Sequence, residues 1–329
     1  MKTNNARQGA KAEGNFLRKK AKGEGFFAEL KRNYALFLML LPGFAATFLF
    51  SYLPIFGIII AFKKFNVKAG IWGSPWCGLR NFKFLFASSD TAIILRNTIG
   101  YNLVFIFAGL ILNVALAIIL NMITNKKLSK VYQTILIMPY FLSFVIVSYI
   151  VYAFLSIDNG FINTHILSAF GMGHYNWYAE TKPWPWIIIF VNFWKTVGYG
   201  SIVYLAAIAG IDSQLYEAAE IDGANRWKQI LHVTLPSLAP IMIIMTIMNV
   251  GKIFNSDFGL FYQVPMNSGA LYSVTNVFST YVYNTLGKGG ITGIGMSSAA
   301  SFFQSTVGFI LVLITNGIVR KIDSENAMF

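Results

Sequence analysis

The sequence is dominated by uninterrupted apolar blocks, each about as long as a lipid bilayer is thick. Hydrophobic residues make up 56% of the 329 residues and charged residues only 12%, against roughly 25% charged residues in typical soluble domains. A membrane-spanning helix needs about 20 mainly apolar residues to cross about 30 Å of hydrocarbon. The blocks therefore predict an integral membrane protein rather than a soluble fold, which needs a polar surface.

Six apolar blocks reach the length of a membrane span, and we predict that each forms one helix. Backbone polar groups in lipid must be satisfied within the segment, which favours helices. The blocks are continuous and do not alternate as the strands of a β-barrel do, so the expected fold is all-α. The predicted spans are residues 36–62, 101–123, 135–155, 186–208, 238–255 and 297–319.

The net charge of +13 comes from basic residues that cluster at the N-terminus and beside the apolar blocks. This placement is typical of residues that set membrane topology and not of a phosphate-binding face, so we expect no nucleic-acid partner. With the N-terminus inside, 16 of the 26 Lys and Arg residues fall in inside segments and seven in outside segments. We therefore expect both termini in the cytoplasm, although five of the outside residues crowd into the first outer loop.

We expect a basic cytoplasmic tail over residues 1–33, a transmembrane domain over 34–322 and a cytoplasmic end over 323–329. The tail resembles the start of a signal peptide, but the apolar run after it is too long for one and no clean cleavage site follows. Cys77 is the only cysteine, so no disulfide forms within the chain. The three histidines are far apart in sequence, and we expect neither a metal site nor catalytic residues.

The loop between the fourth and fifth blocks, residues 209–237, is the most informative segment. It is long for a connection between two membrane helices, and it carries four acidic and two basic residues. We therefore predict a structured element outside the lipid, made of two short helices at about residues 213–222 and 225–233. Small residues in it would let another surface approach closely, so it is either a docking element for a soluble partner or an ordinary connector.

Local signals set the expected ends of these two helices. Ser213 is expected to cap the first helix, and Gly223 to end it with a positive φ. Leu235-Pro236 is expected to end the second helix and start the approach to the fifth span, because proline lacks a backbone N–H.

The same loop contains Glu217-Ala218-Ala219, three residues, Gly223, nine residues, Val233, one residue and Leu235-Pro236. This spacing resembles the EAA motif of the permease subunits of binding-protein-dependent ABC importers, whose pattern has Ile where this chain has Val233. The adjoining sequence IDGA, residues 221–224, resembles the carbohydrate-uptake, maltose-transporter-like branch. Shorter stretches also resemble that branch, namely residues 41–43 (LPG), 78–82 (GLRNF), 96–98 (RNT) and 280–283 (TYVY).

The resemblance implies a type I ABC importer permease fold, with six transmembrane helices and a cytoplasmic coupling helix that docks on a separate ATPase. It implies a multi-pass protein of the cytoplasmic (inner) membrane. The implied partners are a second homologous permease subunit, a dimer of cytoplasmic ATPase subunits and an extracytoplasmic solute-binding protein, besides membrane lipid. The residues that would couple to the ATPase are Glu217, Ala218, Ala219, Asp222, Gly223, Leu235 and Pro236.

This chain lacks the phosphate-binding sequence G-x-x-x-x-G-K-[ST]. We therefore expect no cofactor on it, with ATP and Mg on the partner ATPase. Two other functions stay open. An ion-coupled secondary transporter of a small solute normally has more spans or an inverted repeat, and an integral-membrane enzyme should show clustered catalytic residues at one membrane face.

Polar residues within the apolar blocks are candidates for a substrate path, because ionisable groups are costly in lipid. Lys195 and Lys252 are two such cations, and they would suit an acidic sugar such as an alginate- or pectin-derived oligosaccharide. Snorkelling or internal pairing, for example of Lys252 with Asp257, is the alternative. The candidate path residues are Asn192, Lys195, Tyr199, Asn249, Lys252, Asn255 and Asp257.

The aromatic residues of the outer segment 156–185 and the start of the fourth span allow two interpretations. They are either an interfacial aromatic belt or a surface on which sugar rings stack. The residues in question are Trp177, Tyr178, Trp184 and Trp186.

Overall fold

The computed structural model describes residues 30–87 and 90–322, and the described regular structure is helical. Most of the predicted basic tail and the whole of the predicted C-terminal end lie outside these residues. The chain divides into two compact units, Met1–Gly57 and Ile58–Phe329. The first unit is described from residue 30 and leads into one apolar helical stretch, Tyr34–Phe62. Its parts are α3 (Tyr34–Thr47), the π-helical η1 (Phe48–Tyr52) and the 3₁₀-helical η2 (Leu53–Phe62).

The second unit contains the remaining helices. In chain order they are α4 (Gly70–Gly73), α5 (Arg80–Ala87), α6 (Asp90–Met122), α7 (Lys126–Ile137), η3 (Met138–Phe141), α8 (Phe144–Leu155), η4 (Ile162–Leu167), α9 (Trp184–Ala209), α10 (Ser213–Ile221), α11 (Arg226–Gln229), η5 (Ile230–Thr234), α12 (Leu235–Gly251), η6 (Gly259–Gln263), η7 (Gly269–Leu271), α13 (Tyr272–Thr275), α14 (Phe278–Lys288) and α15 (Gly290–Ile322).

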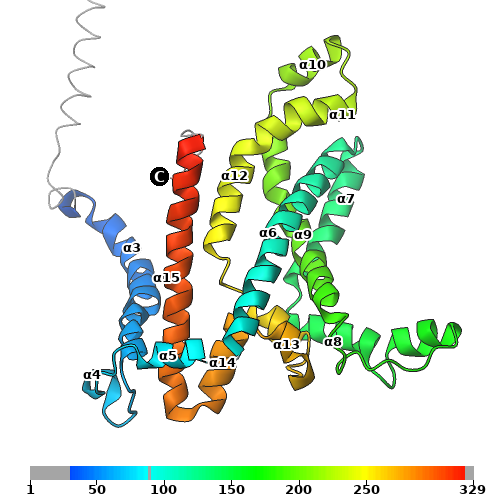
Figure 1. The fold of residues 1–329 in the computed structure, drawn as a ribbon. Helices are drawn as coiled ribbons and strands as arrows, with labels where there is room; N and C mark the ends of the chain where they lie inside the picture. The colour runs from blue at the N-terminus through cyan, green and yellow to red at the C-terminus, as the bar shows by residue number, and fades with distance from the viewer. Residues whose placement is uncertain (1–29, 88–89, 323–329) are drawn as a thin grey trace, which may run out of the picture. The chain divides into compact units, whose positions relative to one another are not determined.

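Helix α6 organises the second unit, because it contributes side chains to all three buried apolar clusters. Tyr101 belongs to the cluster with α8, α9 and η6, and Ile94 to the cluster with α14 and α15. Val114 belongs to the cluster with α9 and α12. Helix α9 packs along α6, and α15 packs against α12 and α14. Figure 1 shows the α6–α7 turn, the α10–α11 hairpin and the last turn of α15 at one end of this unit.

Large apolar side chains are exposed along the long helices, as a lipid-facing surface requires. Phe107 and Ile111 on α6 and Phe309 and Ile314 on α15 are each about half exposed or more. Among the residues that the structure describes, five helices are long and apolar enough to cross a membrane, and they correspond to five of the six predicted spans. Each begins before its predicted start, since a helix continues past the hydrocarbon where hydropathy gives no signal, whereas the helix of the fifth predicted span ends at Gly251, four residues before its predicted end. Helix α6, for example, starts at Asp90 and not at residue 101.

The third predicted span, residues 135–155, is bent and is not one straight helix. Helix α8 leaves the segment formed by α7 and η3 at 97°. The chain turns because Leu142 and Ser143 are both extended, with ψ angles of 134° and 150°. The α7–η3 segment, Lys126–Phe141, is about 24 Å long at 1.5 Å per residue, which is shorter than the hydrocarbon thickness of about 30 Å.

The start of this third segment also differs from the prediction. Asn125 caps α7 by accepting hydrogen bonds from the N–H groups of Lys127 and Leu128 at 3.0 and 3.3 Å. Residues 126–130, which lie between the second and third predicted spans, are therefore the start of α7, and the connection to α6 is a tight turn.

Helices α7 and α9 approach each other closely at a glycine. A Cβ atom on Gly198 would lie 1.9 Å from the backbone oxygen of Leu136, so a larger residue there would force the two helices apart. The requirement for a small residue at a close helix crossing is general in membrane proteins. This contact brings the middle of α9 against the end of α7, a few residues before the bend at Leu142 and Ser143.

Candidate coupling and translocation site

The α10–α11 hairpin projects from the end of the second unit that carries the α6–α7 turn (Figure 1). Its first helix is capped by Asp212, whose carboxylate accepts a hydrogen bond from the Gln214 N–H at 3.0 Å. The prediction that Ser213 is the cap was wrong by one residue, since Ser213 is already helical. Asp and Ser are both good caps, so the sequence DS does not decide between them.

Gly223 ends α10 in the way that the sequence predicts. Its φ is +76°, and the Ala224 N–H donates to the Ala219 carbonyl at 2.9 Å while the Gly223 N–H donates to the Glu220 carbonyl at 3.0 Å. These two bonds form a Schellman motif. The turn therefore redirects the chain sharply into α11, which Asn225 caps by accepting from the Lys228 N–H at 3.0 Å.

The prediction that the second helix of the hairpin ends at Leu235-Pro236 was wrong. Helix α11 continues through the π-helical η5 into α12, and the stretch from Arg226 to Gly251 qualifies as one membrane-length helix. Pro236 lies in the first turn of α12, where a missing N–H is tolerated. The π-helical turn η5, which ends two residues earlier, changes the pattern of backbone hydrogen bonds and so accommodates the proline within the longer helical stretch.

The hairpin carries apolar side chains that the rest of the chain does not cover. Ile221 is 87% exposed and Trp227 73% exposed, and Leu215 and Leu231 are more than half exposed. The Tyr216 hydroxyl, which lies 3.0 Å from that of Thr234, ties α10 to η5. Of the predicted coupling residues, Ala219 and Leu235 are half-buried, and the others are exposed, namely Glu217, Ala218, Asp222, Gly223 and Pro236.

The seven candidate path residues fall into two groups. Asn192, Lys195 and Tyr199 lie on α9, where Lys195 is buried and Tyr199 stacks on Tyr140 of η3 with ring centroids 4.0 Å apart and an interplanar angle of 7°. The Lys195 ammonium donates to the carbonyls of Pro139, Tyr140 and Leu142, at 3.2 Å and 2.7 Å for the first two.

The second group lies at and after the end of α12, away from the hairpin. Its four members are exposed side chains, namely Asn249, Lys252, Asn255 and Asp257. The Asp257 carboxylate accepts from the N–H groups of Gly259 and Leu260 at 2.8 and 3.2 Å. Within the described residues, no ion pair joins Lys252 to Asp257.

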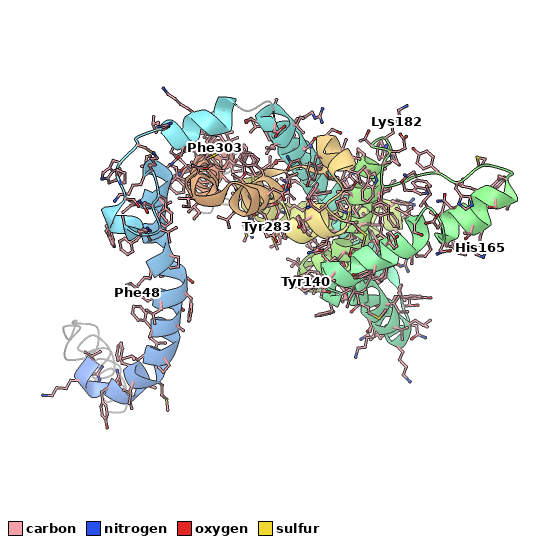
Figure 2. The ribbon with its side chains drawn as sticks, turned by 90° about the horizontal axis from the view of Figure 1, so that it is seen from below. Phe48, Tyr140, His165, Lys182, Tyr283 and Phe303 are labelled. Carbon is pink, nitrogen blue, oxygen red and sulfur yellow. The ribbon has the colours of Figure 1, made fainter. Side chains whose placement is uncertain are left out.

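The outer arm, residues 156–183, which the sequence predicts to lie outside the cytoplasm, is organised by a polar residue that the sequence did not single out. Asn163 is fully buried and donates to the carbonyls of Ser156, Ile157 and Tyr175. Its side-chain oxygen accepts from the indole N–H of Trp177 at 3.2 Å. An Asn in a polar loop carries no sequence signal that distinguishes a buried hub from a solvated side chain. Figure 2 shows His165 toward the free end of this arm.

Of the aromatic residues predicted on the outer side, Trp184 is part of the folded core. Trp184 is fully buried, and its indole N–H donates to the Trp177 carbonyl at 2.6 Å, so neither predicted interpretation applies to it. Trp186 is 74% exposed, as a belt residue would be. Burial, and secondarily the nearby Tyr152, raise the pKa of Tyr178, so this phenol stays neutral at physiological pH.

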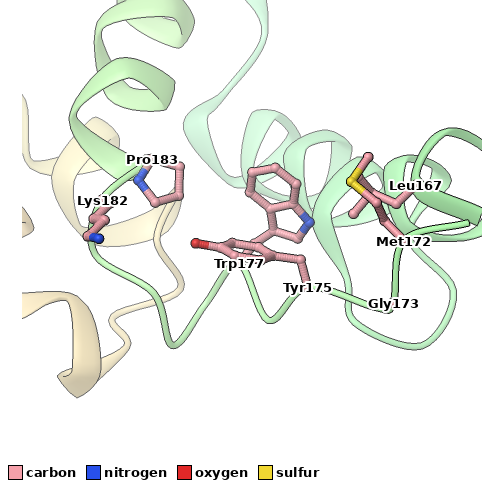
Figure 3. A pocket seen from close by; sticks show the side chains of 7 residues that line it. All are labelled: Leu167, Met172, Gly173, Tyr175, Trp177, Lys182 and Pro183. Carbon is pink, nitrogen blue, oxygen red and sulfur yellow. The ribbon is translucent and has the colours of Figure 1, made fainter. Parts of the chain in front are cut away.

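A cavity of about 530 Å³ opens beside the arm, and Figure 3 shows the side chains around it. Its walls are mainly apolar, with Lys182 as the one charged side chain in the lining. Among the residues that the structure describes, no group of three His, Cys, Asp or Glu side chains could hold a metal ion. The lining residues are Leu167, Met172, Gly173, Tyr175, Trp177, Lys182 and Pro183.

A bundle of membrane-length helices with a projecting polar hairpin defines a polytopic membrane transport subunit. The family described as "Binding-protein-dependent transport system inner membrane component" matches residues 113–324. The chain belongs to this family, which confirms the resemblance carried by the EAA motif.

Individual relatives match over nearly the whole chain. Protein LplB of Bacillus subtilis (strain 168) is 35% identical over 314 residues, which cover 92% of this chain and 94% of LplB. The polygalacturonan/rhamnogalacturonan transport system permease protein YteP of the same organism is 34% identical, over 93% of this chain and 94% of YteP.

Solved structures agree with these relatives. A crystal structure of a bacterial ABC transporter involved in the import of the acidic polysaccharide alginate contains a similar chain, with a TM-score of 0.80 and 32% identity. The match covers 90% of this chain and 99% of that one. The complex of bacterial alginate ABC transporter with an alginate pentasaccharide-bound periplasmic protein gives the same score and identity. The fold is thus that of an ABC importer permease, as the sequence predicts.

The Schellman turn gives a test of the hairpin's construction. Alanine at position 223 would keep a positive φ at a cost of about 1–2 kcal/mol, although nothing lies within 4 Å of the added Cβ. Gly223→Ala should therefore speed amide hydrogen exchange across residues 213–225 by about 5- to 30-fold. Gly210→Ala is the matched control, because its φ is −90° and its Cβ has room. Equal exchange in both variants would show that the turn does not stabilise the hairpin.

Proposed function

We propose that this chain is one of two membrane-spanning subunits of an ATP-driven importer that moves an oligosaccharide across the inner membrane by alternating access. The uncovered apolar surface of the hairpin, within the EAA motif, is the observation that carries the proposal. A polar hairpin that displays Ile221 and Trp227 to solvent calls for a protein partner, since large exposed apolar patches mark interaction sites. In this family the partner is a separate ATPase.

The ATPase subunits would bind ATP and Mg and close together during the cycle. Their closure would pull the two hairpins with them, one from this chain and one from a second homologous permease, and switch the helix bundles between inward- and outward-open states. In this arrangement the hairpin, both termini and the α6–α7 turn lie in the cytoplasm. A solute-binding protein delivers the sugar on the opposite face, as the name of the family implies.

The nature of the cargo is supported by the relatives and by the path residues together. YteP is named for polygalacturonan and rhamnogalacturonan, and the similar crystal structures concern alginate. These are acidic polysaccharides, and the path residues of this chain include the exposed cation Lys252. We therefore propose an acidic oligosaccharide, with Asn192, Asn249 and Asn255 as hydrogen-bonding groups along its route. An ion-coupled secondary transporter and a membrane enzyme have no comparable support.

Reversing the charge on the hairpin should separate this chain from its ATPase. Glu217→Lys places a cation on the exposed face of α10, and we expect at least about tenfold less ATPase to co-purify with the tagged chain. Glu180→Lys makes the same change on the outer arm and should leave co-purification unchanged. If Glu217→Lys retains the ATPase as well as Glu180→Lys does, the hairpin is not the docking element.

The charge of the cargo is tested at Lys252. A hydrogen bond to a charged group contributes about 1.5–3 kcal/mol, so Lys252→Ala should lower the uptake of tetragalacturonate by about tenfold or more. Uptake of the uncharged methyl ester of the same sugar should fall by less than about twofold. The measurement uses the complete transporter in proteoliposomes with its binding protein. Equal loss for both sugars would argue against charge recognition by Lys252.

A further inference from the structure

The break between η3 and α8 interrupts helical hydrogen bonding within the membrane-embedded unit. Leu142 and Ser143 are both extended, so the carbonyls that precede them lose the N–H partners that a continuous helix would supply. Lipid offers no water to replace those partners. The next helix is capped by Ser143 itself, which accepts from the Ile146 N–H at 3.3 Å. On the carbonyl side of the break, Pro139 accepts from the Leu142 N–H at 3.2 Å, whereas the carbonyls of Tyr140 and Leu142 are left without a backbone N–H.

Lys195 supplies the missing donors from the neighbouring helix α9. Its ammonium donates to the carbonyls of Pro139, Tyr140 and Leu142. A lysine ammonium has three N–H donors, and three acceptors occupy them. The side chain is only 7% exposed. The rings of Phe144 and Tyr140 lie 5.0 and 5.7 Å from the nitrogen, which adds cation–π attraction.

The positive charge of Lys195 also favours its position at the end of a helical segment. The carbonyl end of a helical segment carries partial negative charge, and the carboxyl ends of broken membrane helices coordinate cations in transporters. Gly198, one turn further along α9, allows the close approach to α7 that brings the ammonium within reach. Lys195 is therefore committed to the backbone of the break and has no free donor for a sugar.

The break in turn positions an aromatic pair. The carbonyl of Tyr140 is held by Lys195 at 2.7 Å, and the ring of Tyr140 stacks on Tyr199, which lies one turn after Lys195 on α9. Both rings are partly exposed, Tyr140 at 39% and Tyr199 at 46%. Partly exposed parallel rings are suited to pack against the faces of sugar rings.

We propose that Lys195 is a positioning residue: it fixes the angle of the break and thereby the Tyr140–Tyr199 pair, and it does not itself bind the acidic sugar. The part of this inference that concerns sugar rests on the proposed function above. The part that concerns the break does not depend on it, because it describes only the bonding of the chain's own backbone.

The angle of the break can be measured directly in the complete transporter. In a Cys77→Ser background, spin labels at positions 131 and 154 report on exposed sites of α7 and α8. Each limb is about 15 Å long at 1.5 Å per residue, so the observed bend corresponds to about 20 Å between labelled backbones and a straight helix to about 30 Å. We expect Lys195→Met to shift or broaden the distance distribution by about 5 Å or more toward longer values. Lys252→Met, an exposed lysine at the end of α12, is the matched control and should leave the distribution unchanged.

An unchanged distribution in Lys195→Met would overturn the proposal. Should that variant fail to assemble, Lys195→Gln, which keeps two N–H donors and loses the charge, is measured in the same way. Uptake provides the second readout. In Lys195→Met, the uptake rates of tetragalacturonate and of its methyl ester should both fall by at least about tenfold. Selective loss of the acidic sugar would instead assign Lys195 to sugar binding. If the unsubstituted complex takes up neither sugar, the proposed function fails, and the distance measurement still decides the role of Lys195 at the break.

Discussion

Every backbone polar group of this chain that enters lipid must find its partner inside the protein. Continuous helices such as α6 and α15 meet this requirement by themselves, and the break after η3 meets it through Lys195. The same solution recurs in the predicted first outer loop, where the buried Lys63 donates to the carbonyls of Ile71 and Trp72 at 2.9 and 2.8 Å. Part of the unusually basic first outer loop is thus explained by structure and not by topology.

The continuity of α11, η5 and α12 connects the hairpin with the candidate path residues at the end of α12. Residues 226–251 form one stretch, which is about 39 Å long at 1.5 Å per residue. The hairpin lies at one end, and the exposed path residues Asn249 and Lys252 lie at the other. A displacement of the hairpin by a partner would therefore be transmitted along a helix and not through a flexible loop. The irregular points along this stretch are the π-helical turn η5 and Pro240 inside α12.

Hydropathy and motif spacing predicted the membrane class, five of the spans and the permease family, because these depend on local composition and on fixed intervals. The turn at Gly223 was predictable for the same reason, since few residues other than glycine adopt its φ. The bend at Leu142 and Ser143 was not predictable, because the segment stays apolar through the break. The partners of Lys195 and the hub at Asn163 were also beyond reach, since they depend on residues that meet only in the folded chain. The continuation through Leu235-Pro236 shows that a π-helical turn can carry a helix past a proline that, by sequence, predicts a stop.

In the proposed function, the hairpin lies in the cytoplasm and is bound by a separate ATPase. This arrangement is tested most directly by placing a single cysteine at position 221, at the exposed end of α10, in a Cys77→Ser background. A membrane-impermeant thiol reagent should label this cysteine in inverted vesicles stripped of the ATPase but not in right-side-out vesicles, and added ATPase should protect it. Labelling from the outer face, or no protection by the ATPase, would contradict the account.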